Sequence, residues 1–469
     1  MLNTLNDVLN NVDNFIWGMP LIILILFTGI LLTVRLRGLQ IRHLGKALHY
    51  VFHNEDDGEG EVTSFGALCT ALSATIGTGN IVGCATAIVA GGPGALFWMW
   101  LAAFFGMATK YAEGMLAVKY RVIAEDGHAL GGPFYYIEKG MGKNFKWLAK
   151  LFCVFGTMVG LFGIGTFTQV NGITSAVNNF FDPSNVHTIS LFGMNYSISV
   201  VVAGIIVTIC AGLVIIGGIK RISKVSEVIV PFMAVTYIGV CLIIVFTHLP
   251  QVPAAFAEIV QSAFGLKAVA GGAIGAMTVA MQKGIARGIF SNEAGLGSAP
   301  IAAAAAQTNE PVRQGLVSMT GTFIDTIIVC TMTGLAIVMT GAWDMGLEGV
   351  AVTTKAFALG LPFPAKASAF VLMMCLVFFA FTTILGWAYY SERCLEYLFN
   401  RNKAAVTTLA VFIGPFMTVS AVWTIADICN GLMAFPNLVA LLALNGDVVS
   451  ETRGYLERVG IVKTTVGEA

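Results

Sequence analysis

The sequence GTGNIVG, residues 77–83, lies in the middle of an apolar run that extends from about 65 to 90. Glycine is a poor helix former, so a membrane-length helix is expected to open here, and lipid cannot replace the backbone hydrogen bonds that are lost. A second interruption, FSNEAGLGSAP at 290–300, divides the apolar stretch from about 269 to 306. Interrupted helices at corresponding positions in two halves of a membrane protein indicate the binding site of a secondary transporter.

The composition is that of an integral membrane protein. Of the 469 residues, 57% are hydrophobic and 11% are charged, whereas about 25% of residues are charged in soluble domains. The 26 basic and 26 acidic residues balance, so no positive field indicates a nucleic-acid partner, and membrane lipid is the expected surrounding. The first apolar run has basic residues after it and no small-residue cleavage site, so we expect a retained helix and not a signal peptide.

Apolar runs of about 20 residues, the length of one bilayer crossing, predict eleven membrane helices. They lie near residues 15–34, 65–90, 95–118, 147–180, 198–217, 225–248, 269–306, 314–341, 366–397, 404–422 and 424–444. The runs at 147–180, 269–306 and 366–397 are too long for one straight crossing, so they are expected to tilt, break or project into water. Two further stretches, 253–264 and 349–359, predict helices or lids at the outer surface.

The distribution of basic residues predicts the orientation. Loops on one side hold 17 Lys and Arg residues and loops on the other hold 3, and basic loops face the cytoplasm. The N-terminus is therefore expected outside and the C-terminus inside. Without the first helix, ten remain as two groups of five, and an odd-numbered repeat inverts its copy. The predicted divisions are an extra helix and loop (1–60), two inverted repeats (61–250 and 251–445) and a cytoplasmic tail (446–469).

The first interruption has the chemistry to hold a zwitterion together with a small cation. The N-terminal end of a half-helix offers unpaired N–H groups that suit a carboxylate, while freed carbonyl oxygens suit a cation. The alternative is that these glycines only allow helices to pack closely. Close packing alone does not explain Asn80, nor the polar break in the other half.

Two acids lie in or beside apolar runs and leave alternatives open. Glu293, next to Ser291 and Asn292, is paired with Arg287, or protonated, or exposed to water, because an unpaired buried carboxylate is costly. Asp325 is either functional or paired with Arg287 or Lys283. As a proton relay, Asp325 would support proton coupling.

Four other polar or aromatic side chains interrupt apolar helices. The hydroxyls of Thr382 and Thr383 either bond back to carbonyls of their own helix or supply oxygen ligands to sodium. Gln169 either holds two helices together or binds substrate. Trp387 either packs in the core or covers a pocket.

These segments resemble, over nearly the full length of the chain, the alanine or glycine:cation symporter family. Its members are also called sodium:alanine symporters, and the family belongs to the amino acid, polyamine and organocation superfamily. The resemblance is carried by 73–83, GGPFYY at 131–136, GIFSNEAG at 288–295 with GSAP at 297–300, and Thr382-Thr383 with Trp387.

The resemblance implies an all-α polytopic membrane protein with a leucine-transporter-like 5+5 inverted repeat and one extra N-terminal helix. It implies sodium-driven uptake of small neutral amino acids, with alanine, glycine and D-alanine as candidates, across a bacterial-type cytoplasmic (inner) membrane. The implied substrate-binding residues are Gly77, Thr78, Gly79, Asn80, Gln169, Phe290, Ser291, Asn292 and Trp387. The implied sodium ligands are carbonyls near Ser73 and Ile76 and the hydroxyls of Thr382 and Thr383.

Three other function classes compete with this interpretation. A proton-coupled transporter or exchanger is the main alternative, because Asp325 and Glu293 are available as proton carriers. A channel fits less well, since the sequence has no ring of charges and no repeated filter motif. An enzyme is not expected, because no nucleophile, base and orienting residue cluster in one membrane helix.

Overall fold

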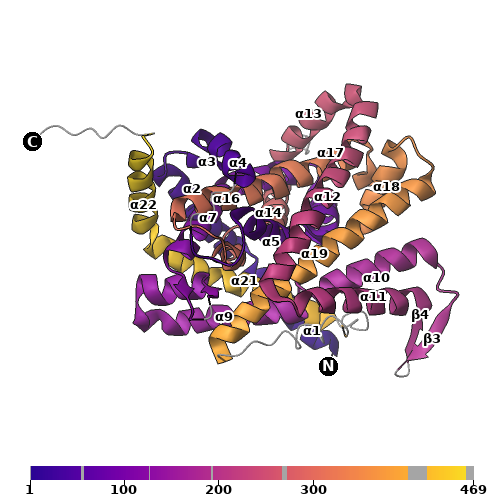
Figure 1. Ribbon diagram of the computed structural model, residues 1–469. Coiled ribbons are helices and arrows are strands. Elements are labelled where there is room, and N and C mark those ends of the chain that lie inside the picture. Colours follow the sequence, from indigo (N-terminus) through magenta and orange to yellow (C-terminus); the bar gives the residue numbers. More distant parts are fainter. Residues whose placement is uncertain are drawn as a thin grey trace, which may run out of the picture.

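The computed structural model describes residues 2–53, 58–125, 127–191, 194–266, 272–399, 413 and 420–460. Its secondary structure is mainly helical, as predicted, with two short antiparallel hairpins (Figure 1). β1 (Val122–Ile123) pairs with β2 (Ala129–Leu130), and β3 (Thr188–Leu191) pairs with β4 (Met194–Ser197). These hairpins were not predicted, because strands of two and four residues are too short to show a clear alternation.

Most of the long helices coincide with predicted apolar runs, whereas α1, α3, α4 and α22 lie largely outside them. The first part of the chain forms α1 (Leu2–Ile16), α2 (Met19–Arg35), α3 (Leu39–Arg42), α4 (Leu44–Phe52), α5 (Ser64–Thr75), the π-helix η1 (Gly79–Gly83), α6 (Cys84–Gly91), α7 (Gly94–Lys119), α8 (Pro133–Tyr136), α9 (Lys146–Phe162), α10 (Phe167–Phe181), α11 (Ile198–Ile215) and α12 (Gly218–Thr247). The second part forms α13 (Val252–Ala263), α14 (Ala273–Asn292), α15 (Ala299–Ala303), α16 (Pro311–Thr322), the π-helix η5 (Phe323–Cys330), α17 (Thr331–Met339), α18 (Val350–Gly360), α19 (Ala365–Phe399), α21 (Ser420–Ala443) and α22 (Asn445–Arg458).

Both predicted interruptions are confirmed as breaks between helices. α5 and the η1–α6 segment are bent by 52° across the first one. α14 ends at Asn292, and α15 begins only at Ala299. The long run at 147–180 also breaks, between α9 and α10, and the predicted helices at 253–264 and 349–359 are present as α13 and α18.

The described helices fit a multi-pass membrane protein. Seven helical segments are long and apolar enough to cross a bilayer, and the bent α5–α6 pair makes an eighth. Two further predicted crossings correspond to the mostly buried α7 and to the broken pair α14–α15. The predicted crossing at 404–422 lies almost entirely outside the described residues, so the number eleven stays a prediction.

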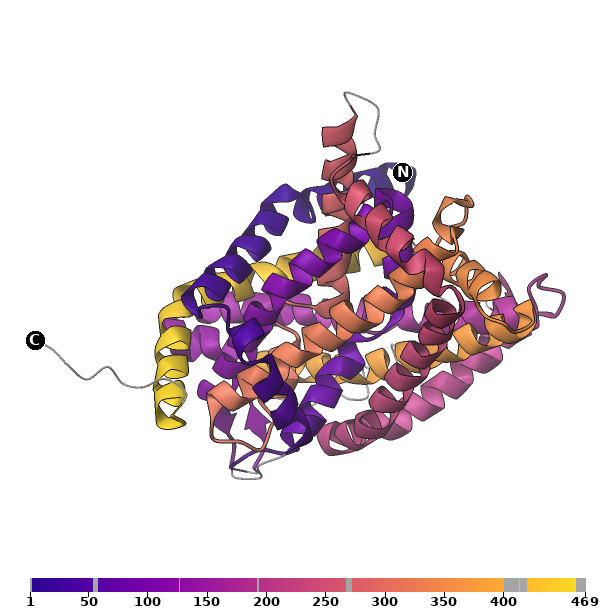
Figure 2. The same cartoon turned by 90° about the horizontal axis from the view of Figure 1, so that it is seen from above.

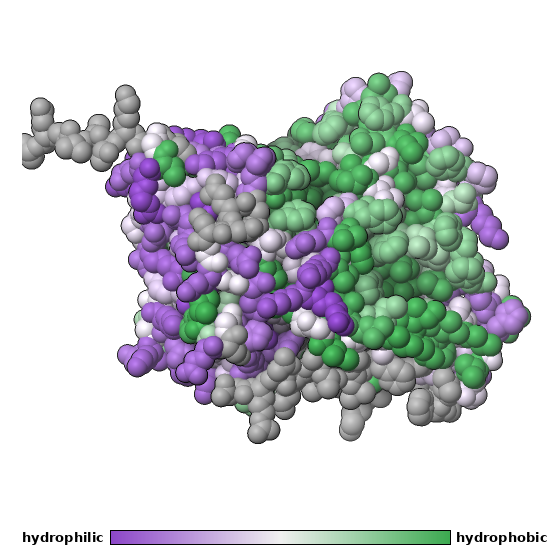
Figure 3. Space-filling view, viewed as in Figure 1, coloured by the Kyte–Doolittle hydropathy of each residue, from purple (hydrophilic) through white to green (hydrophobic). Residues whose placement is uncertain are grey.

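One side of the molecule is covered with apolar side chains. In Figure 3 the hydrophobic residues gather over the region of α10–α13 and α17–α19, and hydrophilic residues gather toward α22. Large exposed residues such as Ile206, Leu213, Val228 and Val235 contribute to this surface from α11 and α12. An apolar surface of this extent faces lipid and not water.

The broken helices occupy the interior. Figure 1 shows α5 and α14 in the middle of the molecule, and α7 packs against both α14 and α16. α5 packs against α12 and α19, and α14 packs against α6. Figure 2 shows α22 at one edge of the molecule, and Figure 1 shows α18 and β4 on the opposite side. The breaks are therefore enclosed by other helices and not exposed to lipid.

Candidate functional site

The first break is stabilised by its own asparagine. α5 ends at Thr75, and the backbone turns through Ile76 before η1 begins at Gly79. Asn80 Oδ1 accepts a hydrogen bond of 2.9 Å from the N–H of Gly77, one of the groups that the interrupted helix leaves unpaired. Asparagine competes in this way for backbone groups, and two flanking glycines make the departure from helix inexpensive.

α19 lies directly against this break. Thr383 Oγ1 lies 3.3 Å from the carbonyl oxygen of Ile76 and 3.0 Å from that of Phe379, and its proton is available to either. The approach is possible because α19 has Gly386 at its contact with α5, where a Cβ would lie 2.7 Å from the Cβ of Ala74. The Thr383 hydroxyl and a freed carbonyl of the first break are therefore brought together.

The hydroxyls of two other residues at the predicted sodium site, Ser73 and Thr382, bond to carbonyls of their own helices. Ser73 Oγ bonds to the carbonyl of Thr70 at 2.7 Å, inside α5. Thr382 Oγ1 bonds back to the carbonyls of α19 and lies 3.5 Å from the sulfur of Met233 on α12. Of the two adjacent threonines, Thr383 reaches the break, and the Thr382 hydroxyl is directed toward α12.

Gln169 connects the first break to the bend between α9 and α10. Its Nε2 donates to the carbonyl of Ile164 at 2.9 Å, and its Oε1 accepts from the N–H of Thr78 at 3.4 Å. Gln169 is 1% exposed, so both of its polar ends are used inside the protein. The bond to Thr78 confirms that Gln169 holds two helices together, and its binding of substrate stays a prediction.

Left-handed backbone conformations produce the second break. Glu293 has a φ of 57°, and Gly295 and Gly297 have φ values of 90° and 81°. Glycine adopts such values without steric cost, whereas a side chain is strained there. Asn292, the last residue of α14, accepts a 3.0 Å bond from the N–H of Ala294 and donates a 3.0 Å bond to Thr326 Oγ1.

The two breaks meet. A Cβ placed on Gly79 would lie 3.5 Å from both Cδ1 of Phe290 and Cα of Ser291. Thr78 at the first break also lines a cavity of about 220 Å³ that extends between α10, α18 and α19. The lining residues of this cavity are Thr78, Val82, Thr168, Asn171, Gly172, Ser175, Ala176, Val350 and Leu376.

Asp325 joins both breaks through hydrogen bonds. Its carboxylate accepts 2.7 Å from Asn80 Nδ2, 2.9 Å from Ser291 Oγ and 2.7 Å from Thr326 Oγ1. It is 0% exposed. Among the described residues, Asp325 forms no ion pair with Arg287 or Lys283, and three hydrogen-bond donors take the place of the cation.

Glu293 is also held by neutral donors. Trp387 Nε1 donates to it at 2.9 Å and Ser298 Oγ at 2.5 Å. The guanidinium of Arg287 instead lies 5.4 Å from the ring centroid of Phe290, and within the described part of the chain it forms no ion pair with Glu293. Trp387 therefore contacts the second break directly, besides packing in the core.

Two buried charged residues of α7 were missed by the sequence analysis. Lys110 and Glu113 are 3% and 0% exposed. Glu113 Oε1 accepts 3.1 Å from the N–H of Gly295 and 2.6 Å from Nδ2 of Asn437, so α7 and α21 both support the second break. The sequence did contain a signal, because two ionisable residues three positions apart inside an apolar run are rare and mark function or a specific partner.

Comparison with known proteins identifies the family. Residues 2–466 match the sodium:alanine symporter family. The chain is 55% identical over 98% of its length to an uncharacterized transporter of Haemophilus influenzae, of which it covers 98%. It is 46% identical over 96% of its length to the sodium/alanine symporter AgcS of Methanococcus maripaludis, of which it covers 97%.

A solved structure supports the fold independently. The crystal structure of MhsT in complex with L-phenylalanine matches with a TM-score of 0.60 at 12% sequence identity, covering 84% of this chain and 93% of that one. At this identity the match concerns the fold alone, which is leucine-transporter-like. Together with the family match, it identifies the chain as a multi-pass membrane transporter and not an enzyme. The chain belongs to the sodium:alanine symporter family of sodium-coupled amino acid symporters.

Proposed function

We propose that this protein couples inward sodium movement to the uptake of a small neutral amino acid, with alanine, glycine and D-alanine as candidates. The observation that carries the proposal is the meeting of the two helix breaks at Gly79 and Phe290. Main-chain groups of the two interrupted helices and neutral polar side chains converge there, which suits a zwitterion. The name of the M. maripaludis relative supports alanine and sodium as the pair.

In this proposal the substrate carboxylate binds main-chain N–H groups of the first break, at Gly77 to Asn80. The ammonium group binds oxygens of the second break near Phe290, Ser291 and Asn292. Gln169 and Trp387 would border the proposed substrate site, consistent with their contacts to Thr78 and Glu293. Alternating access then requires each end of the site to open in turn, with substrate and sodium favouring the occluded state.

The test is uptake of radiolabelled alanine into proteoliposomes that contain the purified protein. An inward sodium gradient is expected to drive uptake, and a potassium gradient of the same size is not. Unlabelled glycine and D-alanine as competitors would rank the candidate substrates. Absence of uptake under the sodium gradient, from protein that is folded and correctly inserted, would contradict the proposal.

We further propose that sodium binds between the first break and α19, at Ser73, Ile76, Thr382 and Thr383. Thr383→Val keeps the shape of the side chain but removes the hydroxyl next to the Ile76 carbonyl. It is expected to raise the sodium concentration for half-maximal uptake about tenfold, the equivalent of about 1.4 kcal/mol, because one oxygen ligand of the ion is lost. Thr382→Val is the matched variant, and its effect is expected to be smaller because its hydroxyl is directed toward Met233. Equal effects of the two substitutions would contradict the placement of Thr383 closer to the sodium ion than Thr382.

Phe290 is proposed to limit the size of the substrate side chain. Phe290→Ala is expected to raise the uptake of leucine relative to alanine by about tenfold, the lower end of what a hydrophobic wall provides. The measurement is competition of labelled alanine uptake by unlabelled leucine. Phe232→Ala, on the exposed surface of α12, is the control. An unchanged preference for alanine over leucine would contradict the proposal that Phe290 limits the size of the substrate.

The same proposal includes the orientation and the two repeats. The basic loops, the α22 end among them, would face the cytoplasm, and 61–250 and 251–445 would be the inverted repeats. Labelling of single introduced cysteines by a membrane-impermeant reagent in intact cells tests the orientation. Labelling of a cysteine at the end of α22 in intact cells would show that the orientation is the opposite of the one proposed.

Proton coupling is kept as a second candidate because of one observation. Three acids, Glu113, Glu293 and Asp325, are buried around the breaks together with the single buried cation Lys110 among the described residues of that region. An excess of buried carboxylates favours binding of a cation or a proton. Uptake that persists without sodium and collapses with a protonophore would favour this candidate.

A further inference from the structure

The chain before α5 and the chain after α15 are joined by a small backbone structure that we call the closing knot, made of residues 58–63, residues 304–309 and Arg121. Val62 pairs with Ala306 in a parallel bridge, and the N–H of Gln307 donates to the carbonyl of Val62 at 2.7 Å. The first of these segments leads into α5 and the second leaves α15. The two broken helices are therefore tied to each other at the closing knot.

Arg121 holds the closing knot together. Its NH1 donates to the carbonyls of Ala304 and Ala306, at 2.9 and 2.6 Å, and its NH2 donates to Thr308 at 2.7 Å and also to Glu59. A guanidinium can donate to several acceptors at once from a fixed plane. Arg121 thereby joins both chain segments of the knot to the end of α7.

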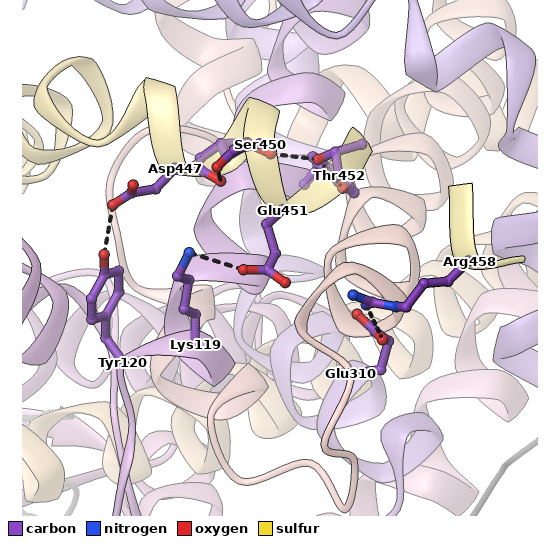
Figure 4. Close-up of polar contacts among 10 residues, drawn as sticks. Lys119, Tyr120, Glu310, Asp447, Ser450, Glu451, Thr452 and Arg458 are labelled. Carbon is purple, nitrogen blue, oxygen red and sulfur yellow. Dashed lines mark hydrogen bonds and ion pairs between the residues drawn. The ribbon is translucent and has the colours of Figure 1, made fainter. Parts of the chain in front are cut away.

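The C-terminal helix α22 lies beside this knot and bonds to its flanks (Figure 4). Lys119 Nζ lies 2.9 Å from Glu451 Oε2, and Tyr120 donates to Asp447 Oδ2 at 2.6 Å. Both residues directly precede Arg121. Burial, together with the Asp447 carboxylate, raises the pKa of Tyr120 above its usual range, so the phenol keeps the proton that it donates.

α22 also bonds to residues that precede or follow the two chain segments of the knot. Arg458 NH2 lies 2.8 Å from Glu310 Oε2, two residues after Thr308 (Figure 4). The hydroxyls of Tyr455 and Tyr50 are 2.6 Å apart, and Tyr50 lies in α4, the helix that precedes the 58–63 segment. α22 therefore contacts Tyr50, which precedes the 58–63 segment, and Glu310, which follows the 304–309 segment.

α22 also connects the knot to a different part of the molecule. Only Leu444 separates it from α21, which packs against α9 and α1. A movement of α7 and the knot relative to α9 must therefore break contacts of α22 or bend the chain at Leu444. The two ion pairs of α22 suit reversible breakage, since Lys119 and Glu451 are each 26% exposed and Arg458 is 58% exposed, and ion pairs in contact with water are individually weak.

We propose that α22 is a latch that stabilises the closed state of the closing knot and detaches when the knot opens. The functional part of this inference rests on the proposed alternating access. Its structural part, that α22 protects the closing knot from opening, can be tested without transport. The residues that carry it are positioning residues and do not touch the substrate.

The test is hydrogen–deuterium exchange of the full-length protein, followed in peptides that contain 58–63 and 304–309. Glu451→Lys places two cations together and is expected to raise exchange in both segments about threefold, the effect of losing one ordinary ion pair. The double variant Lys119→Glu with Glu451→Lys restores opposite charges and is expected to return exchange to the wild-type rate. Lys146→Glu is the matched control, since it breaks the 2.8 Å pair with Glu138, which includes no residue of the knot or of α22.

The outcomes separate the latch from the transport proposal. Unchanged exchange in Glu451→Lys, or exchange raised equally by Lys146→Glu, would overturn the latch. Raised exchange that the double variant reverses would support it, even if no alanine uptake is found. Where uptake is measured, Glu451→Lys is expected to raise the KM for external alanine about threefold, because less protein is closed at the knot. An unchanged KM together with raised exchange would overturn the coupling of the latch to transport.

Discussion

Replacing Asp325 by asparagine is expected to reduce alanine uptake at a fixed sodium concentration about 100-fold. The carboxylate accepts from Asn80, Ser291 and Thr326, and an amide would direct an N–H group at one or two of these donors. Each buried donor left without an acceptor costs about 1–3 kcal/mol. Because Asn80 and Ser291 belong to the two breaks, their mispositioning is expected to lower kcat/KM and not only stability.

The measurement is the initial rate of uptake in proteoliposomes over a range of alanine concentrations. Asp344→Asn is the matched control, because Asp344 is an exposed acid in the turn after α17. Gel filtration and thermal unfolding of the purified variants would separate a loss of function from a loss of folding. Near-normal kcat/KM in Asp325→Asn would show that the carboxylate is not needed to hold the breaks together.

Gly386→Ala is also expected to have a large effect, through sodium and not through substrate. The new Cβ would lie 2.7 Å from the N and Cβ atoms of Ala74 and 2.8 Å from its Cα. Backbone atoms cannot rotate away, so α19 must move from α5, at a cost of about 1–3 kcal/mol for overpacking. Thr383, one turn earlier on α19, then loses its contact with the Ile76 carbonyl.

We expect Gly386→Ala to abolish the sodium dependence of uptake or to raise the sodium requirement at least about tenfold, the equivalent of about 1.4 kcal/mol. Gly239→Ala in α12 is the control, since nothing lies within 4 Å of the added Cβ and alanine favours helix. The readout is uptake over a range of sodium concentrations at saturating alanine. A normal sodium response would mean that the contact of α5 with α19 does not form the sodium site.

The hydrogen-bond partners of Asp325 and Glu293 could not be predicted from the sequence. The sequence marks both as costly buried acids, and the cations considered as their partners were Arg287 and Lys283. The structure satisfies both acids with neutral donors instead, from Asn80 and Trp387 among others. Which donors reach a buried carboxylate depends on how each helix is rotated about its axis, and hydropathy does not report this rotation.

The sequence by itself determined the class of the protein, the positions of both helix breaks and the family. These features are local: a run of apolar residues sets the length of a membrane helix, and glycines with polar neighbours interrupt it where backbone groups need other partners. For the same reason the resemblance could be read from short motifs such as 73–83 and 288–295.

The tertiary structure decided the contacts between residues that are far apart in the chain. Asn80 and Asp325 are 245 positions apart, Lys119 and Glu451 are 332 apart, and Glu113 meets Asn437 across 324. Such pairs form only when separate helices pack at particular angles and depths. Packing alone therefore decided three features. They are the different contacts of Thr383 and Thr382, the support of the second break by α7, and the position of α22 beside the closing knot.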